Sequence, residues 1–121
     1  MTAIASLTQW VSASPGVEGA IVMDANTGVL LEAELPDRHA SVVAPLLTVL
    51  MDAAHRAALE LGRGSLRRVV VEGDFGPLLV MEDSQDRILA VLGQQNLSLG
   101  RLLDDGESLR AQFLSEPRVA L

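Results

Sequence analysis

The chain has 121 residues, which suits one folded domain with its own core and is too short for two. Sixteen acidic residues, nine arginines and no lysine give a formal net charge of −7, so a nucleic-acid backbone would be repelled. The chain has no cysteine, which excludes disulfides, thiolate nucleophiles and cysteine-ligated zinc. We therefore expect a single domain over residues 1–121 that does not bind nucleic acid.

The first elements in chain order are a short helix and a β-hairpin. Apolar residues at helical spacing predict a helix over residues 2–13, which the Pro-Gly pair at 15–16 ends. An apolar, β-branched run over residues 17–24 predicts a strand. The turn at 26–28 contains Asn and Gly, which tolerate positive φ, and residues 29–34 return as a second strand.

The longest predicted element is a helix over residues 40–61, which follows a break at 35–37 and ends at Gly62 as a C′ glycine. Pro45 is compatible with this helix if the helix begins near Val42. If the helix begins earlier, the proline should kink its first turn.

Three strands and a helix complete the chain, with Pro117 ending the helix. We expect the strands at residues 66–72, 78–82 and 87–92, the turns at 73–76 and 83–86, and the helix at about 98–114. Strands joined by turns of this length predict an antiparallel meander. The element order indicates one α+β domain.

The long helix has one narrow polar stripe, and almost all its other positions are aliphatic. The stripe consists of Thr48, Asp52, Arg56 and Glu60, with His55 beside it. A helix that packs on one sheet needs an apolar arc of about 100°, whereas here the arc sweeps roughly 160°. The second side is covered either by the two other helices or by a second copy of the chain. We favour the second copy, because an uncovered apolar face promotes aggregation.

The sequence contains no recognisable catalytic motif. Without lysine there is no phosphate-loop motif, and neither a dinucleotide-binding glycine motif nor a Gly-x-Ser-x-Gly elbow is present. Asp52 and His55 have a metal-binding spacing, and Asp104, Asp105 and Glu107 form an acidic cluster, but we interpret both groups as solvated helix faces. We predict a protein that is not an enzyme and needs no cofactor or metal.

Location and surface charge give two further expectations. We expect no secretory leader and no membrane insertion, because the longest apolar run, 42–51, is far shorter than the roughly 20 residues of a membrane span. A cytoplasmic location follows. Arg63, Arg67 and Arg68 form the one local basic cluster. It could bind an acidic partner, but we favour a charged edge that discourages strand aggregation.

Residues 14–24 and 27–30 resemble the opening of Roadblock/light-chain-7 domains, in which a Pro-Gly-Val stretch, a hydrophobic strand and an Asp–Gly turn follow the first helix. The segments 61–72, 76–80 and 89–92 fit the same family, so the resemblance covers nearly the whole chain. It implies a five-stranded antiparallel sheet with the long helix on one face and the terminal helices on the other, as in profilin- and longin-like sandwiches.

The resemblance also implies dimerisation through the long helix and the third strand. Carried over to this chain, the interface consists of Val43, Leu46, Leu47, Leu50, Ala54, Ala57, Leu61, Val69 and Val71. The two-sided apolar helix favours the same contact independently of the family.

Members of this family serve as dynein light chains and as scaffolds for small GTPases, and MglB-like bacterial members stimulate GTP hydrolysis by repositioning the GTPase's own residues. The family has no catalytic motif to transfer. We therefore predict a homodimeric module that regulates or scaffolds a small Ras-like GTPase. A GTPase-independent scaffold in a motility or signalling complex and a small-ligand sensor are the alternatives. Asp52, Arg56 and Glu60 are candidate partner contacts, although we favour a solvated polar face as their role.

Overall fold

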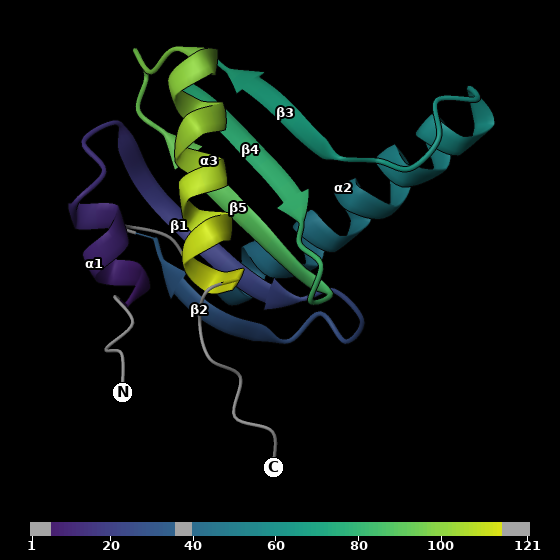
Figure 1. Ribbon diagram of the computed structural model, residues 1–121, viewed down its shortest axis with the longest axis horizontal. Helices are drawn as coiled ribbons and strands as arrows, with labels where there is room; N and C mark the ends of the chain where they lie inside the picture. Colours follow the sequence, from purple (N-terminus) through teal and green to yellow (C-terminus); the bar gives the residue numbers. More distant parts are fainter. Residues whose placement is uncertain (1–5, 36–39, 115–121) are drawn as a thin grey trace.

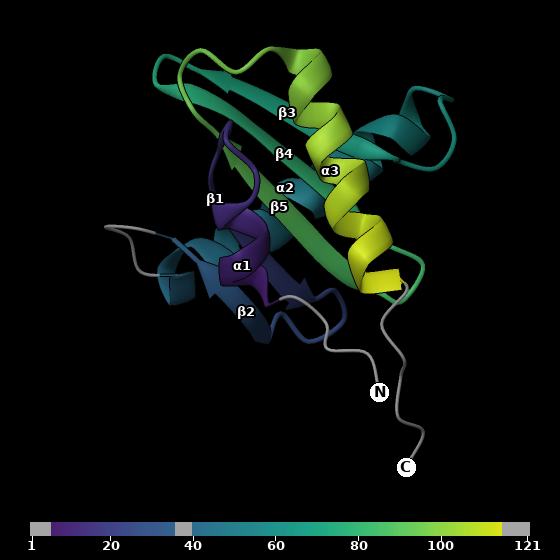
Figure 2. The ribbon, with the colours of Figure 1, turned by 60° about the vertical axis from the view of Figure 1, so that its left-hand side comes forward.

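The computed structural model describes residues 6–35 and 40–114, which form a five-stranded antiparallel sheet and three helices. The strand order across the sheet is β2-β1-β5-β4-β3. The elements are α1 (Leu7–Ser12), β1 (Val17–Asp24), β2 (Leu30–Glu34), α2 (Ala40–Glu60), β3 (Arg68–Gly73), β4 (Gly76–Glu82), β5 (Arg87–Gly93) and α3 (Leu99–Leu114). Helix α2 crosses one face of the sheet, and α1 and α3 lie on the other (Figures 1 and 2). This arrangement confirms the expected fold class and layers.

Two hydrophobic cores lie on the two faces of the sheet, because successive strand residues point to opposite sides. The core under α2 consists of Ile21, Met23, Ala44, Leu47, Met51, Val80, Ile88 and Ala90. The core under α1 and α3 contains Leu7, Trp10, Val22, Leu79, Leu89, Val91, Leu102 and Leu109. The central strands β1 and β5 supply both cores, which explains why their sequences are almost continuously apolar.

A reciprocal capping box begins α1. The hydroxyl of Ser6 accepts a hydrogen bond from the Gln9 backbone N–H, and the Gln9 side chain accepts one from the Ser6 N–H. The Leu7 N–H donates to Glu32 Oε1 at 3.0 Å, which ties the helix to strand β2. The predicted start at residue 2 lies outside the described residues.

The turn between β1 and β2 is organised by the Asp24 carboxylate. Its Oδ1 accepts hydrogen bonds from the backbone N–H groups of Thr27 and Asn26, at 2.9 and 2.8 Å. The Thr27 bond, joined by the Asn26 bond, holds the pKa of the Asp24 carboxyl below its usual value despite partial desolvation. Gly28 adopts the expected positive φ of 74°, and β2 begins one residue later than predicted, at Leu30.

Helix α2 begins at Ala40, so Pro45 lies within the helix and not in its first turn. The proline removes the hydrogen bond that its N–H would donate to the carbonyl of Ser41. Ser41 is exposed, so water can satisfy that carbonyl. At the other end Gly62 has φ 69°, and the Arg63 N–H donates to the Ala58 carbonyl at 2.8 Å. This geometry confirms Gly62 as the C′ glycine of a Schellman motif.

The hairpin of β3 and β4 differs from the expected one at both ends. Gly73 pairs with Gly76, which leaves only Asp74 and Phe75 in the turn, where four residues were predicted. Gly76 has φ 135°, and a Cβ there would collide with the Gly93 carbonyl, so the close approach requires glycine. Strand β3 begins at residue 68 and not at 66.

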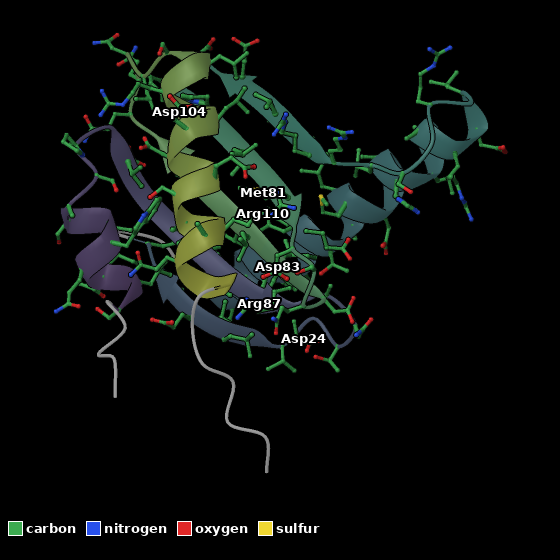
Figure 3. All side chains as sticks on the ribbon, in the orientation of Figure 1. Asp24, Met81, Asp83, Arg87, Asp104 and Arg110 are labelled. Carbon is green, nitrogen blue, oxygen red and sulfur yellow. The ribbon has the colours of Figure 1, made fainter. Side chains whose placement is uncertain are left out.

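A buried ion pair fixes the turn between β4 and β5 (Figure 3). Arg87 Nε donates to Asp83 Oδ2 at 2.8 Å, while Asp83 Oδ1 accepts from the backbone N–H groups of Gln85 and Arg87. The two side chains are only 6% and 0% exposed, for Arg87 and Asp83 respectively. From the sequence we predicted a turn here but not the ion pair.

Candidate interface on the long helix and the edge strand

Helix α2 buries only a narrow side against its own sheet. Ala44, Leu47 and Met51 are the buried residues of the helix, and they lie three and four positions apart. Leu47, which we expected at a dimer interface, is 4% exposed and packs in the core of its own chain. The side chain is therefore covered mainly by its own chain, and its part in a dimer interface stays a prediction. Val43 and Leu50 are half-buried at the margin of the same core.

The opposite side of α2 exposes large aliphatic side chains. Val42, Leu46 and Val49 are 64%, 64% and 65% exposed, and the small Ala53 and Ala57 continue the row. At about 100° per residue these five positions fall within roughly 80° of the helix surface. We call this row the outer apolar face of α2. Val42 and Val49 were missing from the expected interface, although the same angular count could have included them.

The C-terminal half of α2 extends beyond the edge of the sheet, past β3 (Figures 1 and 2). From Asp52 to Glu60 only Ala54 and Ala58 are even half-buried. Leu59 is exposed, and so is Leu61 just after the helix. A helix gains most of its stability from packing, so this half lacks the contacts that normally support a helix of this length.

Strand β3 forms one edge of the sheet and pairs only with β4 among the described strands. Val69 is half-buried against the α2 core, whereas Val71 is exposed. Both valines point to the α2 side of the sheet. The free edge of β3 and the overhanging half of α2 both carry exposed aliphatic residues, Val71 on the strand and Leu59 on the helix.

An apolar groove of about 370 Å³ lies beside the N-terminal half of α2, between the helix and the turn of the β3–β4 hairpin. Phe75, at the tip of this turn, is 84% exposed. The groove is lined by Glu18, Ile21, Val43, Leu47, Gly73, Asp74, Phe75, Gly76, Pro77, Leu78, Ala90, Leu92 and Gly93. Its walls are mostly apolar, so it suits an aliphatic or aromatic group better than a charged one.

The predicted polar stripe lies on the solvent side of α2. Asp52, Arg56 and Glu60 are exposed, and Thr48 Oγ1 donates to the carbonyl of Ala44 at 3.4 Å. His55 and Asp52 border the same shallow hollow as Arg56. No group of three or more His, Asp or Glu side chains in the described part of the chain could hold a metal ion.

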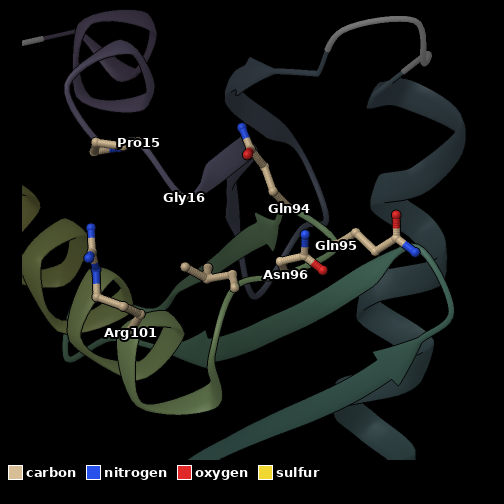
Figure 4. Close-up of a pocket in the computed structure, with 7 residues that line it drawn as sticks. Pro15, Gly16, Gln94, Gln95, Asn96 and Arg101 are labelled. Carbon is tan, nitrogen blue, oxygen red and sulfur yellow. The ribbon is translucent and has the colours of Figure 1, made fainter.

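Two further cavities lined in part by polar side chains lie elsewhere in the described part of the molecule. The first, of about 410 Å³, lies between the start of β3 and α3, and contains Arg67, Arg68 and Arg110 together with Glu82 and Glu107. It unites two members of the expected basic cluster with α3, while Arg63 lies apart in the loop after α2. The second lies between the α1–β1 turn and the start of α3, and Gln94, Gln95, Asn96 and Arg101 are among its walls (Figure 4).

By length and composition alone, α2 could cross a membrane, and it is the one helix in the described residues that meets this test. In this fold the apolar residues of α2 are divided between packing on the sheet and an exposed surface. Ala44, Leu47 and Met51 cover the sheet, Val43 and Leu50 lie at the margin of the same core, and Val42, Leu46 and Val49 lie on the outer apolar face.

A model of the Roadblock/LC7 domain matches residues 4–93 of the chain. The chain belongs to the Roadblock/LC7 domain family. An uncharacterised protein of Methanocaldococcus jannaschii is 33% identical over 86 residues, which are 70% of this chain and 74% of that protein.

Two solved structures share the fold. A Roadblock/LC7 domain from Streptomyces avermitilis has a TM-score of 0.70 and 22% identity, and the match covers 90% of this chain and 95% of that one. The gliding protein MglB from Thermus thermophilus has a TM-score of 0.74 and 19% identity, and the match covers 88% and 81%. At these identities the structures show a common fold.

The Roadblock/LC7 match ends at Gly93, the last residue of β5. The outer apolar face of α2, the edge strand β3 and the apolar groove therefore lie within the Roadblock/LC7 domain, whereas α3 lies after it. Roadblock/LC7 domains are generally non-catalytic regulators and scaffolds. Within this chain, the exposed apolar surface beside β3 is thus a better functional candidate than any of the polar cavities.

Proposed function

We propose that this Roadblock/LC7 protein is a cytoplasmic, non-catalytic homodimer that regulates or scaffolds a small Ras-like GTPase. One observation carries the proposal: the outer apolar face of α2 and the free edge of β3 both present aliphatic side chains that have no cover in the described chain. Exposed apolar side chains grouped on one face mark interaction sites on soluble proteins.

A second copy of the chain fits this surface. A two-fold axis beside β3 brings the same face of both molecules together, so that each outer apolar face covers the other. The small side chains of Ala53 and Ala57 allow the two helices to approach closely, since the distance between packed helices depends on the residues at the contact. Leu46, Val49 and Val71 then leave water in both copies.

The apolar groove supports the same arrangement. Because α2 extends past β3, it reaches the region of space that a partner sheet beside β3 would occupy (Figure 1). There it lies against the α2 side of the partner, where the groove beside Val43 and Leu47 is open. Leu61, at the end of the overhanging half, is an aliphatic side chain of the kind that this groove accepts.

The GTPase is proposed because the chain offers a binding surface without chemistry of its own. The family resemblance associates Roadblock/LC7 domains with small GTPases. The exposed polar stripe of α2 supplies charged side chains that can recognise such a partner. We assign Asp52, Arg56 and Glu60 to that role. Preference for the GTP form requires contacts with switch segments that are ordered only while the γ-phosphate is present.

The test titrates the protein against small GTPases of its own organism, loaded with GDP or with a GTP analogue. We expect a dimer mass by light scattering and tighter binding of the GTP form, weakened by Arg56→Glu. Arg63→Glu, with the same charge change in the loop after α2, is the matched control. A monomer mass would refute the homodimer. Equal affinity for both nucleotide states, or no binding, would favour the GTPase-independent scaffold.

A small-ligand sensor is the second candidate, and the groove itself favours it. Its volume of about 370 Å³ lies within the range of known ligand sites, about 300–1,000 Å³. A fluorescent apolar probe distinguishes the two uses of the groove. A groove filled by a partner helix excludes the probe at concentrations where the dimer forms, whereas a sensor binds it in the dimer.

A further inference from the structure

The free edge of β3 presents the backbone groups of alternate residues. Glu72 lies opposite Pro77 in the hairpin, and proline has no N–H to donate, so this is a non-hydrogen-bonded pair of the ladder. The N–H and C=O of Glu72 therefore point away from β4. By the alternation of an antiparallel ladder, those of Val70 and Arg68 do so too. The edge thus offers three regularly spaced residues for another strand to bind.

The side chains of these three residues share one face of the sheet. Val70 packs against the core under α3, and Arg68 Nη1 lies 3.7 Å from Glu107 Oε2 on α3. Glu72 has the same parity and lines a small cavity with Leu97. The strand therefore carries a positive charge near its start, an aliphatic residue in its middle and a negative charge near its end, all on the α3 side.

In the homodimer proposed above, in which the β3 edges of the two copies pair antiparallel as the family resemblance implies, we propose a single register centred on Val70, in which Arg68 lies opposite Glu72 of the partner subunit. The proposal rests on the homodimer proposed above and specifies its register. The two-fold axis passes between the paired Val70 residues, so the charge pair occurs twice. On the other face the same register places Val69 opposite Val71 of the partner subunit, which extends the apolar contact of the α2 side.

The neighbouring registers lose this complementarity. A two-fold axis at Arg68 or at Glu72 places like charges opposite one another, which destabilises a strand pair. An axis at Val69 sets Arg68 opposite Val70 of the partner subunit and leaves Glu72 beyond the start of the partner's β3, and an axis at Val71 sets Glu72 opposite Val70 of the partner subunit and leaves Arg68 beyond its end. Arg68 can exchange its contact with Glu107 for one with Glu72 of the partner subunit, because the Arg68 and Glu107 side chains are 40% and 51% exposed and their charged atoms are 3.7 Å apart. Only the register centred on Val70 places both charges opposite a charge of the other sign. The charge pattern of β3 is therefore complementary to itself in this one register.

Cysteine cross-linking tests the register directly, since the natural chain has no cysteine. In the proposed dimer Val70→Cys faces itself across the axis, within the separation that a disulfide spans. Val69→Cys and Val71→Cys, the matched controls, are diagonal to themselves at about 7–8 Å between Cα atoms, which is too far. We expect rapid oxidative dimer formation by Val70→Cys alone.

Charge reversal provides the second test. Arg68→Glu and Glu72→Arg should each weaken the dimer about tenfold or more, because each alters two symmetry-related pairs. Combining them in one chain should restore most of the affinity, and added salt should reduce all these effects. Arg67→Glu, with the same charge change on the neighbouring position, controls for net charge and should have little effect.

The outcomes separate this proposal from the dimer itself. Cross-linking by Val69→Cys or Val71→Cys, or an intact dimer in which no variant cross-links, would overturn the register and leave the homodimer standing. A double reversal no better than the single ones would also overturn the charge pairing. A monomer mass for the natural chain would overturn both proposals together.

Discussion

Substituting aspartate for Leu46 or for its neighbour Leu47 should separate the effect of α2 on dimerisation from its effect on folding. Leu47 is 4% exposed and lies in the core, whereas Leu46 is 64% exposed on the outer apolar face. Burying a leucine contributes about 1.5–3 kcal/mol, and an unpaired carboxylate in an apolar site costs several kcal/mol more or is neutralised. Leu47→Asp therefore removes an amount comparable to the whole stability of a small domain, about 5–15 kcal/mol.

Leu46→Asp should leave the fold intact and weaken the dimer. About two-thirds of the leucine burial energy remains to be gained on association, or about 1–2 kcal/mol per copy. Symmetry doubles this to about 2–4 kcal/mol, which corresponds to a dimer weaker by about thirtyfold to several-hundredfold. Thermal melting followed by circular dichroism reports the fold, and light scattering over a dilution series reports the mass. An unchanged dimer in Leu46→Asp, or a fully stable Leu47→Asp, would refute this division of the helix.

Three further predictions concern stability and chemistry. Asp83→Ala leaves the Arg87 guanidinium without its buried carboxylate and should lower the free energy of unfolding by about 3–5 kcal/mol in urea titration; a loss below 1 kcal/mol would contradict a structural role for the pair. The Asp24 pKa is lowered in the folded state, so its stabilising effect is complete above the ordinary aspartate range and disappears as the pH falls through the lowered value. The stability difference between the natural protein and Asp24→Ala should thus be largest near neutral pH and vanish in acid, and a difference independent of pH would count against the Asp24 turn as its source. The purified protein should not hydrolyse GTP or ATP, since it lacks a phosphate-binding lysine; turnover that one substitution in the chain abolishes would disprove this.

The sequence was sufficient to predict the elements and their layers because most of them carry unambiguous local signals. Strand β1 has the predicted bounds, and Gly62 ends α2 as expected. The β3–β4 hairpin was less predictable. The turn has a glycine at each end, and the hydrogen-bonded pairing of β3 with β4 continues as far as these glycines, Gly73 and Gly76. Local composition does not show how far two strands stay paired.

The candidate interface was predicted only in outline. Helical periodicity showed that α2 is apolar over too wide an arc for one sheet, but periodicity does not tell which part of the arc meets that sheet. Leu47 and Leu46 are equivalent by composition and differ only in the three-dimensional direction of the sheet. The ion pair of Asp83 and Arg87 left no local signal beyond a turn, because its burial depends on strands and a helix that are distant in sequence.

We expect the overhang of α2 to shorten the lifetime of a copy that has no partner. The half of the helix beyond β3 is held in a single molecule mainly by its own backbone hydrogen bonds, and isolated helices of this length are marginal in water. Its amide protons should exchange rapidly in a dilute sample, while those at Ala44–Met51 exchange slowly, and concentration should remove the contrast. A frayed helix end is also a site where proteases cleave. In the homodimer proposed above, we therefore expect unpaired copies to be degraded faster than paired ones, so that the overhang would set a lower limit on the concentration at which the protein persists.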